Sequence, residues 1–388
     1  MKICDLALFS QSTSSGVRTY IESKIEYVSR RPHIDHVVIV PGEKDAVRVQ
    51  GRSKVIAVRG MPSPYPGIRI GMNIGRIADL IENESPDIIE LNCQYTLAWP
   101  AFLATRQSRI PIVGVYHTDV PACVRHWART MGVIASAAER IVEWYEGLIY
   151  RHCTLTIILN PGMTDRVRRL GVHRVRCLPC GVDVDMFHPT KRDPRFRERF
   201  GMTPDQKVLL YAGRLSPEKE LDVLFAAYAR LPSGKFILMI AGDGPDAGSV
   251  RRYAAAHAGV RYLGHVESRT ELAEVYASSD LFVMPGRHET FGMATLEAIA
   301  SGLPVAGIQD CGTATLVPPQ IGMLARAGDA AHLAEAISEV AAWPESRTRE
   351  VCHSFASDRF SWTDVFDQYF DVYRGLVDDA ASSRAQLA

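Results

Sequence analysis

Short apolar segments of strand length alternate with amphipathic segments of helical length through both halves of the chain. In the first half the expected strands read KICDLALF, HVVIVPG, KVIAVRG, DIIELN, IPIVGVYH and LTIILN. In the second half they read KVLLYAG, KFILMIAG, VRYLG, LFVMPG, LPVAGI and a short one near GMLARAG. Continuous apolar strands separated by helices are typical of parallel sheets covered on both faces. The sequence therefore predicts two doubly wound α/β units in tandem.

Helical periodicity fills the spaces between these strands. We expect helices over Arg18–Arg30, Ile74–Glu84, Glu218–Leu231, Arg269–Ser278 and Thr290–Ser301, and one or two amphipathic helices within Cys123–Arg151. An aromatic-rich segment, FSWTDVFDQYFDVYRGLV, predicts a final helix, and the polar residues 378–388 after it predict a disordered tail. At 388 residues the chain is long for one hydrophobic core. We expect one domain at 1–185 and a second at 186–361.

Composition and charge narrow the class of protein. Hydrophobic residues make up 47% of the chain, and 44 basic residues balance 44 acidic ones. This balance argues against a nucleic-acid-binding protein, which usually carries a basic excess. The apolar start of the chain is short and broken by Asp5, so a buried strand explains it better than a signal peptide. No segment is long enough to cross a bilayer, so we expect a cytoplasmic protein.

Eight cysteines are scattered along the chain. Cys177 and Cys180 have the spacing of a redox pair or of half a zinc site, but no second pair of ligands follows at zinc-finger distance. We therefore expect most of the cysteines to be small buried residues and expect no metal site, while a redox role for Cys177 and Cys180 stays open.

The segment 281–307, LFVMPGRHETFGMATLEAIASGLPVAG, is the strongest candidate site. A strand runs into a loop that opens a helix near Thr290–Met293. Ligands of open α/β sheets bind beyond the carboxyl ends of strands, at such helix N-termini. The backbone N–H groups of Phe291, Gly292 and Met293 could point at an anion, and Gly292 would let a phosphate approach. The segment therefore indicates a phosphate-bearing ligand.

Two carboxylates, Glu289 and Glu297, flank the start of this helix with seven residues between them. Eight residues of helix rise about 12 Å, which is too far for the paired carboxyls of a glycoside hydrolase. They could instead bind hydroxyl groups at two ends of one long ligand. A helix-capping Glu289 and a surface Glu297 remain the alternative.

A second cluster follows the strand KVLLYAG. Arg214 stands at the end of that strand, and Ser216-Pro217 has the signature of a helix start, which places Lys219 in the first helical turn. Two cations at a helix start oppose the helix dipole, so they suggest a bound anion such as a diphosphate. A solvated pair offset by Glu218 and Glu220 would explain the same residues.

Two further positions follow strands of the first half. The loop Ser14–Val17, which contains Gly16, joins the first strand to its helix, where a phosphate or sugar could approach, although a plain turn explains it as well. His117 ends the strand IPIVGVY at the same edge of the sheet. A structural and a functional role for His117 are about equally supported.

Together these segments resemble the family-4 retaining glycosyltransferases, which include bacterial mannosyl- and glucosyltransferases and relatives of sucrose synthase. The resemblance covers nearly the whole chain and is carried by SSGVRTY, VYHTD, CGVDVDMFHP, AGRLSPEKE, AGDGP, ETFGMATLEAIASGLPV and FSW. It implies the GT-B fold, with two Rossmann-like domains facing a central cleft, and a final helix, about 362–380, that packs back on the first domain. It also implies transfer of a hexosyl unit from a nucleoside-diphosphate sugar of the GDP-mannose or UDP-glucose type, with retention, to a hydroxyl acceptor. No metal or other cofactor is obligatory in this family.

The resemblance also assigns roles to individual residues. Arg214 and Lys219 would hold the diphosphate, Glu297 the ribose hydroxyls and Glu289 the transferred sugar. The amides of Phe291, Gly292 and Met293 would lie near sugar and phosphate, and the backbone of Val266 would meet the base. Gly16 would approach the diphosphate from the first domain, and His117 would contact the sugar near the reacting carbon. His117, Glu289, Arg214 and Lys219 are thus the expected catalytic residues.

The sequence departs from the family pattern at two places, and other classes of protein stay open. Ser15-Gly16 stands where two glycines are common, and Gly286-Arg287-His288 replaces a serine-bearing loop. The acceptor could be a lipid or a glycan. Five arginines, joined by Trp127, Trp144 and Tyr145, suggest peripheral contact with the inner face of a membrane, although a solvated helix face explains the arginines as well; they are Arg166, Arg168, Arg169, Arg174 and Arg176. A non-catalytic membrane-associated scaffold and an epimerase or phosphorylase on the same fold are the alternatives.

Overall fold

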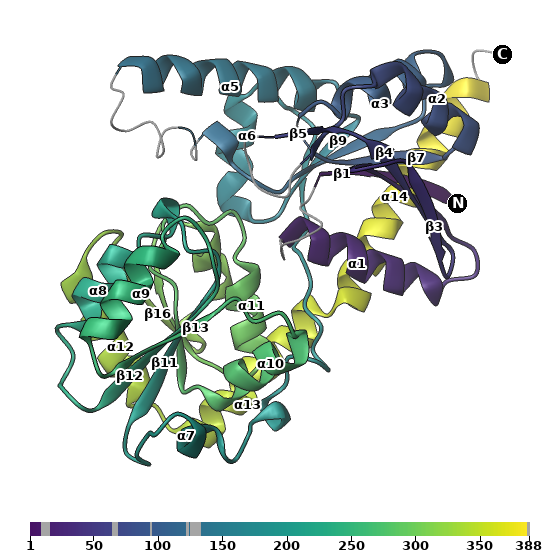
Figure 1. Cartoon of the computed structure of the whole chain (residues 1–388). Coiled ribbons are helices and arrows are strands. Elements are labelled where there is room, and N and C mark those ends of the chain that lie inside the picture. The colour runs from purple at the N-terminus through teal and green to yellow at the C-terminus, as the bar shows by residue number, and fades with distance from the viewer. Residues whose placement is uncertain (9–15, 64–68, 94, 122–123, 125–132, 386–388) are drawn as a thin grey trace. The chain divides into compact units, whose positions relative to one another are not determined.

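The structure, a computed structural model, describes residues 1–8, 16–63, 69–93, 95–121, 124 and 133–385 (Figure 1). The chain divides into two compact units. The first unit consists of Met1–Asp119, Glu139–Gly181 and Trp362–Ala388, and the second of Val120–Ala138 and Val182–Ser361. Each unit contains an open, mostly parallel sheet with the strand order of a Rossmann fold. The prediction of two doubly wound α/β units is therefore confirmed.

The sheet of the first unit has the order β10-β9-β8-β7-β1-β2-β4-β3, and β3 alone runs antiparallel to its neighbour. Nearly all residues of β1, β2, β7 and β8 are buried, as expected for central strands covered on both faces. The exposed edge strand β3 was not expected from the sequence. The strands are β1 (Lys2–Ala7), β2 (Asp35–Gly42), β3 (Ala46–Gln50), β4 (Ser53–Arg59), β7 (Ile88–Asn92), β8 (Ile112–Tyr116), β9 (Leu155–Ile158) and β10 (Val175–Cys177), and a separate short hairpin pairs β5 (Met61–Pro62) with β6 (Arg69–Ile70).

The helices of the first unit follow the expected pattern. Helix α2 begins where the Asn73 side chain accepts a hydrogen bond from the Arg76 amide, and it ends at Ser85 in the left-handed conformation. These are the ordinary start and stop signals of a helix, which explains why the prediction for Ile74–Glu84 matches the structure. The helices are α1 (Gly16–Ser29), α2 (Ile74–Glu84), α3 (Ala98–Ser108), α5 (Val133–Arg151), α6 (Thr164–Arg169) and α14 (Trp362–Ala385).

Helix α14 returns from the end of the second unit to pack on α1. Tyr27 donates a hydrogen bond of 2.5 Å to Asp367 and packs its ring against Phe366 and Phe370. The Tyr369 hydroxyl donates to the Leu178 carbonyl. The helix continues to Ala385, so the expectation of a disordered tail is wrong for residues 378–385. Alanine favours helix, and the segment DDAASS extends one already formed by the packed aromatic residues before it.

The second unit has a sheet of the order β13-β12-β11-β14-β15-β16, and all neighbouring strands are parallel. Helices α8, α9 and α12 lie on one face and α10, α11 and α13 on the other (Figure 1). The strands are β11 (Lys207–Ala212), β12 (Phe236–Ala241), β13 (Val260–Gly264), β14 (Leu281–Val283), β15 (Val305–Ile308) and β16 (Gly322–Ala325). The helices are α7 (Phe196–Arg199), α8 (Leu221–Tyr228), α9 (Ala247–Ala256), α10 (Arg269–Ser278), α11 (Met293–Ala300), α12 (Ala330–Ala341) and α13 (Glu345–Phe360).

The main segment of the second unit begins at Val182, a few residues before the boundary expected at 185/186, and Val120–Ala138 of the expected first domain also belong to this unit. The Val182 amide donates to the Phe360 carbonyl at 2.7 Å, and Val182 forms a parallel bridge with Ser361. Phe187 is fully buried and packs edge-to-face on Tyr276. Residues 182–187 therefore belong to the second unit, with Val182 and Phe187 buried in it.

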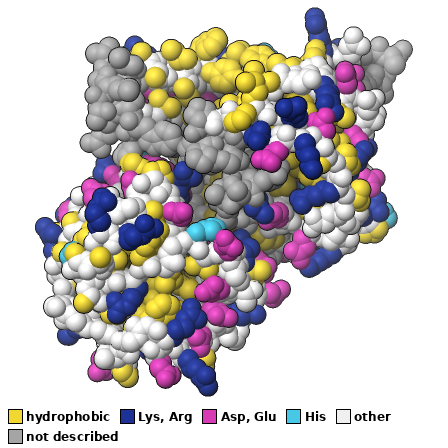
Figure 2. Space-filling view, viewed as in Figure 1, with side chains coloured by type: hydrophobic (Ala, Val, Ile, Leu, Met, Phe, Trp, Pro, Cys, Tyr) yellow, Lys and Arg dark blue, Asp and Glu magenta, His cyan; other side chains and the backbone are white. Residues whose placement is uncertain are grey.

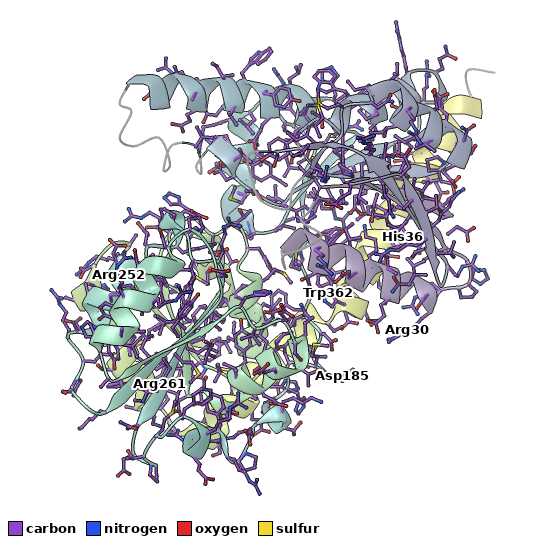
Figure 3. The ribbon with its side chains drawn as sticks, in the orientation of Figure 1. Arg30, His36, Asp185, Arg252, Arg261 and Trp362 are labelled. Atoms are coloured by element: carbon purple, nitrogen blue, oxygen red, sulfur yellow. The ribbon has the colours of Figure 1, made fainter. Side chains whose placement is uncertain are left out.

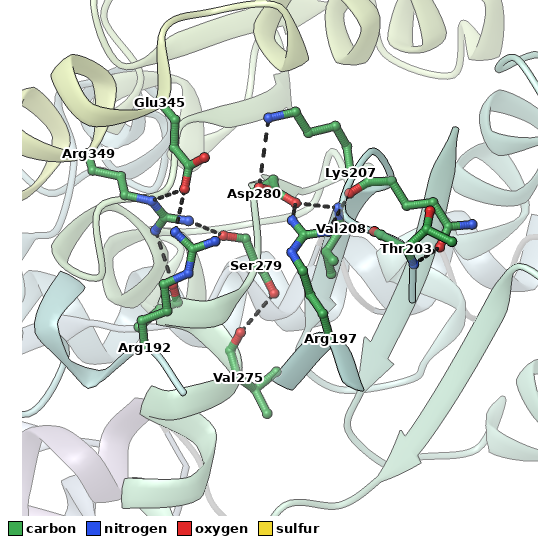
Figure 4. Close-up of polar contacts among 12 residues, drawn as sticks. Arg192, Arg197, Thr203, Lys207, Val208, Val275, Ser279, Asp280, Glu345 and Arg349 are labelled. Atoms are coloured by element: carbon green, nitrogen blue, oxygen red, sulfur yellow. Dashed lines mark hydrogen bonds and ion pairs between the residues drawn. The ribbon is translucent and has the colours of Figure 1, made fainter. Parts of the chain in front are cut away.

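A buried carboxylate ties together the amino ends of the strands in the second unit (Figure 4). Asp280, which precedes β14, accepts hydrogen bonds from the Val208 amide at 2.7 Å and from Arg197 at 2.8 Å. Lys207 lies 3.9 Å from its other oxygen. The Asp280 side chain is only 4% exposed, so these contacts fix β14 to β11 at the edge opposite the strands' carboxyl ends.

Within the described residues, no helix is both long enough and apolar enough to cross a bilayer.

Candidate active site

The candidate site of the second unit lies where the order of the strands in its sheet reverses, between β11 and β14. Strands β11 and β14 are neighbours, but the strands that follow each of them are added on opposite sides. The loops that leave the carboxyl ends of such a pair run apart and open a crevice in which ligands of α/β proteins bind. The loop after β11 carries Arg214 and Lys219, and the loop after β14 carries Glu289.

Lys219 and Glu289 meet across these two loops. Ser216 has extended backbone and starts a 3-10 turn over Pro217–Lys219, which ends at Glu220 in the left-handed conformation with φ of 51°. Lys219 donates its Nζ proton to Glu289 Oε1. Each of the two side chains is 16% exposed. The start signal at Ser216 was thus predicted correctly, but Lys219 lies in a 3-10 turn and not in the first turn of the α-helix, because Glu220 interrupts the helix before α8.

The sequence analysis considered Glu220 only as a charge that could offset Arg214 and Lys219, whereas in the structure it holds the loop that carries residues 286–288. Its carboxylate accepts hydrogen bonds from the backbone amide of Arg287 at 3.1 Å and from Arg287 Nε at 2.8 Å. A Cβ atom at Gly286 would lie 3.0 Å from Lys219 Cα, so this loop passes very close to the 3-10 turn. The contact between Glu220 and Arg287 could not be predicted from a local sequence pattern, because the two residues are 67 positions apart. The Arg287–Glu220 pair is how this chain fixes a loop that departs from the family pattern.

Helix α11 starts beside this ion pair. Gly292 is its N-cap with φ of 95°, so the helix begins at Met293, slightly later than the predicted Thr290. The amides at the start of α11 have no partner within the helix, and Phe291, just before the cap, is buried. The hydroxyls of Thr295 and Thr313 are buried and have no hydrogen-bond partner within the described part of the chain. A Cβ atom at Gly292 would lie 2.8 Å from the Thr313 hydroxyl and 3.4 Å from that of Thr295. Helix amides and two hydroxyls thus gather at one point, which suits an anion.

We expect Gly292→Ala to destabilise the protein and to weaken binding of a nucleoside diphosphate. The left-handed backbone costs a non-glycine residue about 1–2 kcal/mol, and the new methyl group would also clash with the Thr313 hydroxyl. Gly248→Ala is the matched control, because its Cβ would meet nothing closer than 3.6 Å and it lies inside helix α9. That control should be neutral or slightly stabilising. Melting curves with and without the nucleotide test this, and equal curves for the two variants would contradict it.

Glu297 lies on the buried side of α11 and has weak partners. Tyr276 and the guanidinium of Arg269 each donate to it at 3.4 Å, which is long for a hydrogen bond to a carboxylate. Burial raises the pKa of Glu297, against the opposing effect of Arg269. Arg269, which also lies over the Phe187 ring, was missed by the sequence analysis. A carboxylate held this loosely could accept stronger hydrogen bonds from ligand hydroxyls.

Other predicted residues of the second unit lie at the same edge of its sheet. Arg214 follows β11, and its carbonyl accepts a hydrogen bond from the Tyr211 hydroxyl at 2.8 Å. Val266 lies half-buried in the loop between β13 and α10. The loops after β11 and β12 are packed backbone to backbone, since a Cβ atom at Gly242 would lie 1.9 Å from the Gly213 carbonyl oxygen. Only glycine fits at position 242, so close packing of the two loops explains the glycine after Ala241 in the AGDGP segment.

The remaining predicted residues belong to the first unit. Gly16 is the first residue of α1 and is exposed, whereas the loop residues 9–15 before it lie outside the described residues. His117 follows β8 and is half-buried, and its Nε2 lies 2.7 Å from Asn92 Oδ1. Cys177 is exposed, and Cys180 is buried, which raises its pKa to about 12; both are free thiols.

Two glycosyltransferase family models match nearly the whole chain. Residues 14–186 match the model of the glycosyltransferase family 4, and residues 193–352 match that of the glycosyl transferases group 1. A GDP-mannose-dependent alpha-mannosyltransferase of Mycobacterium tuberculosis is 32% identical over 327 residues, which cover 82% of this chain and 82% of that protein. A protein of the same description from Corynebacterium glutamicum is 29% identical over 92% of this chain and 83% of its own length.

Solved structures show the same fold. Sucrose-phosphate synthase from Thermosynechococcus elongatus superposes with a TM-score of 0.79 at 19% identity, over 97% of this chain and 99% of that one. Anabaena HepE in complex with UDP superposes with a TM-score of 0.73 at 17% identity, over 97% and 100% of the two chains. The chain has the GT-B fold, belongs to the family-4 glycosyltransferases of group 1, and is an enzyme that transfers a sugar from a nucleotide-sugar donor.

Proposed function

We propose that this enzyme moves a hexosyl unit from a nucleoside-diphosphate sugar to an acceptor hydroxyl with retention of the anomeric configuration. The donor is of the GDP-mannose type, because the bacterial relatives are named GDP-mannose-dependent mannosyltransferases, with UDP-glucose as the second candidate. The observation that carries the proposal is the Lys219–Glu289 pair beside the start of α11. It places a cation and a carboxylate beside the start of a helix, at the point where the strand order of the sheet reverses.

Each residue of this group has a role that fits its surroundings. Lys219 and Arg214 bind the diphosphate and stabilise the negative charge that grows on it as the sugar departs. The amides after Gly292 and the Thr295 and Thr313 hydroxyls bind the same anion. Glu289 binds hydroxyls of the sugar.

The other predicted residues complete the donor contacts in this proposal. Glu297 accepts hydrogen bonds from the ribose, Val266 meets the base through its backbone, and Phe291 packs behind the helix start. From the first unit, Gly16 approaches the diphosphate and His117 contacts the sugar. No carboxylate nucleophile is needed if the departing phosphate takes the acceptor proton on the same face of the sugar.

A donor screen tests the proposed reaction. The full-length enzyme is first heated with GDP, UDP and ADP, and the nucleotide that raises the melting temperature identifies the donor series. The matching sugar nucleotides are then incubated with an alkyl glycoside, and proton NMR of the product reads the anomeric configuration. Retained configuration supports the proposal. An inverted product, or epimerised or phosphorolysed donor in place of a glycoside, would overturn it.

We further propose that the acceptor is carried at a cytoplasmic membrane surface. Helix α3 and the first-unit part of α5 lie side by side, because Trp99 donates to the Tyr145 hydroxyl at 3.0 Å and Phe102 packs on His152. Exposed apolar side chains gather over these helices (Figure 2). They include Ile141 and Trp144, which are 65% and 63% exposed.

Basic residues flank these apolar side chains, as they do in helices that lie on anionic bilayers. Arg106 and Arg140 are exposed on the same two helices. The basic cluster predicted around α6 contributes less, because Arg166 is bound to Asp119 and Glu143. Trp127, the other predicted aromatic residue, lies outside the described residues.

We expect the double substitution of Ile141 and Trp144 by serine to lower binding to anionic vesicles by about a hundredfold or more, because each of the two apolar side chains contributes about 1.5–3 kcal/mol when buried. Co-sedimentation with phosphatidylglycerol vesicles measures this. The matched control replaces Val47 and Val49, which are 61% and 73% exposed on the edge strand β3. Equal loss in both variants, or no binding by the unmodified protein, would contradict the membrane proposal.

A further inference from the structure

A row of buried polar side chains crosses the first unit at the point where the order of the strands in its sheet reverses, between β1 and β7. Lys24 of α1 is at its centre and is fully buried. Its Nζ lies 3.1 Å from Asp5 of β1 and 2.6 Å from Glu90 of β7. Burying three charged groups is costly, and replacing such groups with apolar ones is often neutral or stabilising. Their presence calls for a reason other than stability.

The row continues from Glu90 to His117. Asn92 donates its Nδ2 proton to Glu90 Oε1 at 2.8 Å, and Asn92 Oδ1 lies 2.7 Å from His117 Nε2. Lys24, Glu90, Asn92 and His117 thus form one continuous hydrogen-bonded chain. Its last member is the histidine at the carboxyl end of β8.

The direction of each hydrogen bond in this chain is fixed by chemistry. Glu90 Oε1 already accepts from the Lys24 ammonium, so the Asn92 atom that faces it must be the amide nitrogen. The Asn92 oxygen therefore faces His117 and can only accept. His117 Nε2 must carry a proton. The second oxygen of Glu90 has no hydrogen-bond partner within the described residues, so a proton on Glu90 would sit there and leave this order unchanged.

We propose that Asn92, held by Glu90 and Lys24, is a positioning residue that fixes His117 as the Nε2–H tautomer and leaves Nδ1 as the acceptor for a hydroxyl of the donor sugar. The inference rests on the proposed role of His117 in sugar binding. No hydrogen bond to Nδ1 is made within the described part of the chain. Asn92 thus acts through His117 and need not touch the substrate.

The surroundings of His117 keep its ring neutral. Burial, together with the nearby positive charge of Lys24, lowers the pKa of His117 to about 3, against the opposing effect of Asp5. Tyr20 packs edge-to-face on the imidazole at 5.2 Å between ring centres. Burial also raises the pKa of Glu90, to about 7. A neutral imidazole is a hydrogen-bond acceptor for a sugar hydroxyl and not a general acid.

A second branch of the same buried group provides a control. His36, labelled in Figure 3, contacts Asp5 through Nε2 at 2.9 Å and Ser53 through Nδ1 at 3.0 Å. This branch leaves Lys24 in the direction away from His117. Ser53→Ala removes one buried hydrogen bond of a histidine but leaves the chain from Lys24 to His117 intact.

Nitrogen-15 NMR of the histidine rings in the full-length protein reads the tautomer without any substrate. The His117 signal is assigned from its absence in His117→Gln. We expect Nε2–H, with no protonation between about pH 5 and pH 8. Asn92→Leu should lose this preference. Asn92→Asp keeps an acceptor and adds a charge, so it should keep Nε2–H and raise the pKa of the ring. Ser53→Ala should leave the signal unchanged.

Kinetics with the donor found in the screen provide the second readout. We expect Asn92→Leu to lower kcat by about tenfold or more, since a wrong histidine tautomer can cost up to about 10⁴ in other enzymes. KM for the acceptor should change little, and Ser53→Ala should keep the normal kcat. An Nδ1–H tautomer in the unmodified protein would overturn the inference, as would an unchanged tautomer and kcat in Asn92→Leu. If Asn92→Leu does not fold, the tautomer of the unmodified protein and the pKa change in Asn92→Asp still decide the matter.

The two proposals fail in different ways. If no donor is turned over, the proposed reaction fails while the NMR result stands. If transfer occurs and His117→Gln is fully active, the tautomer is fixed but has no use in sugar binding, and the inference is overturned.

Discussion

Lys219→Ala is expected to lower kcat by about 10²–10³, the usual cost of removing one group that stabilises developing negative charge. In the structure Lys219 already lies against Glu289, so the variant also removes the partner of a carboxylate proposed to bind the sugar. Lys219→Arg should recover part of the activity, because it restores the charge but not the geometry.

The control for this prediction is Lys235→Ala. Lys235 is an exposed lysine just before β12, at the edge of the same sheet opposite the site. It should keep normal turnover. Both variants should show circular dichroism and cooperative melting close to those of the unmodified enzyme. A turnover of Lys219→Ala within a few fold of normal would remove Lys219 from the proposed mechanism.

Asp280→Ala is expected to have the largest effect on stability, a loss of about 3 kcal/mol or more in the free energy of unfolding of the second unit. Removing one partner of a buried ion pair typically costs about 3–5 kcal/mol, and Arg197 and the Val208 amide would lose their shared acceptor. For a unit of this size each kilocalorie corresponds to roughly 2–4 °C in melting temperature.

Calorimetry measures this loss, and Asp205→Ala is the control, since Asp205 is exposed in the segment just before β11. Because Asp280 lies at the amino ends of the strands, turnover of Asp280→Ala at low temperature should stay near normal. A variant as stable as the control would show that the network drawn in Figure 4 contributes little.

The helices and strands of this protein were largely predictable from the sequence, whereas the contacts at Lys219 and Asp280 were not. The strands were predictable because central parallel strands are buried on both faces, so β2 and β12 are apolar along nearly their whole length. The helix Ile74–Glu84 was predictable because its start and stop signals are local. Such signals act over a few residues, so they can be recognised without knowledge of the rest of the chain.

The missed features depend on contacts between distant residues. In the sequence Glu220 was only a possible counter-charge for Arg214 and Lys219, but its carboxylate binds Arg287 and its backbone is left-handed. Asp280 contacts Arg197 and Val208, which lie more than 70 residues before it. The row from Lys24 to His117 joins residues of α1, of β7 and of the segment after β8. The valines of β3 alternate with polar residues, as in a strand, but the alternating segment is short and all five residues are exposed.

The return of α14 to the first unit has a consequence for biosynthesis. The second unit needs no residue after Ser361, so its segments are made before those of α14. The first unit is complete only when α14 has been made, because Tyr20 and Tyr27 of α1 pack against Phe366. A chain truncated after Ser361 should therefore fold its second unit but expose the aromatic side chains of α1 to chaperones.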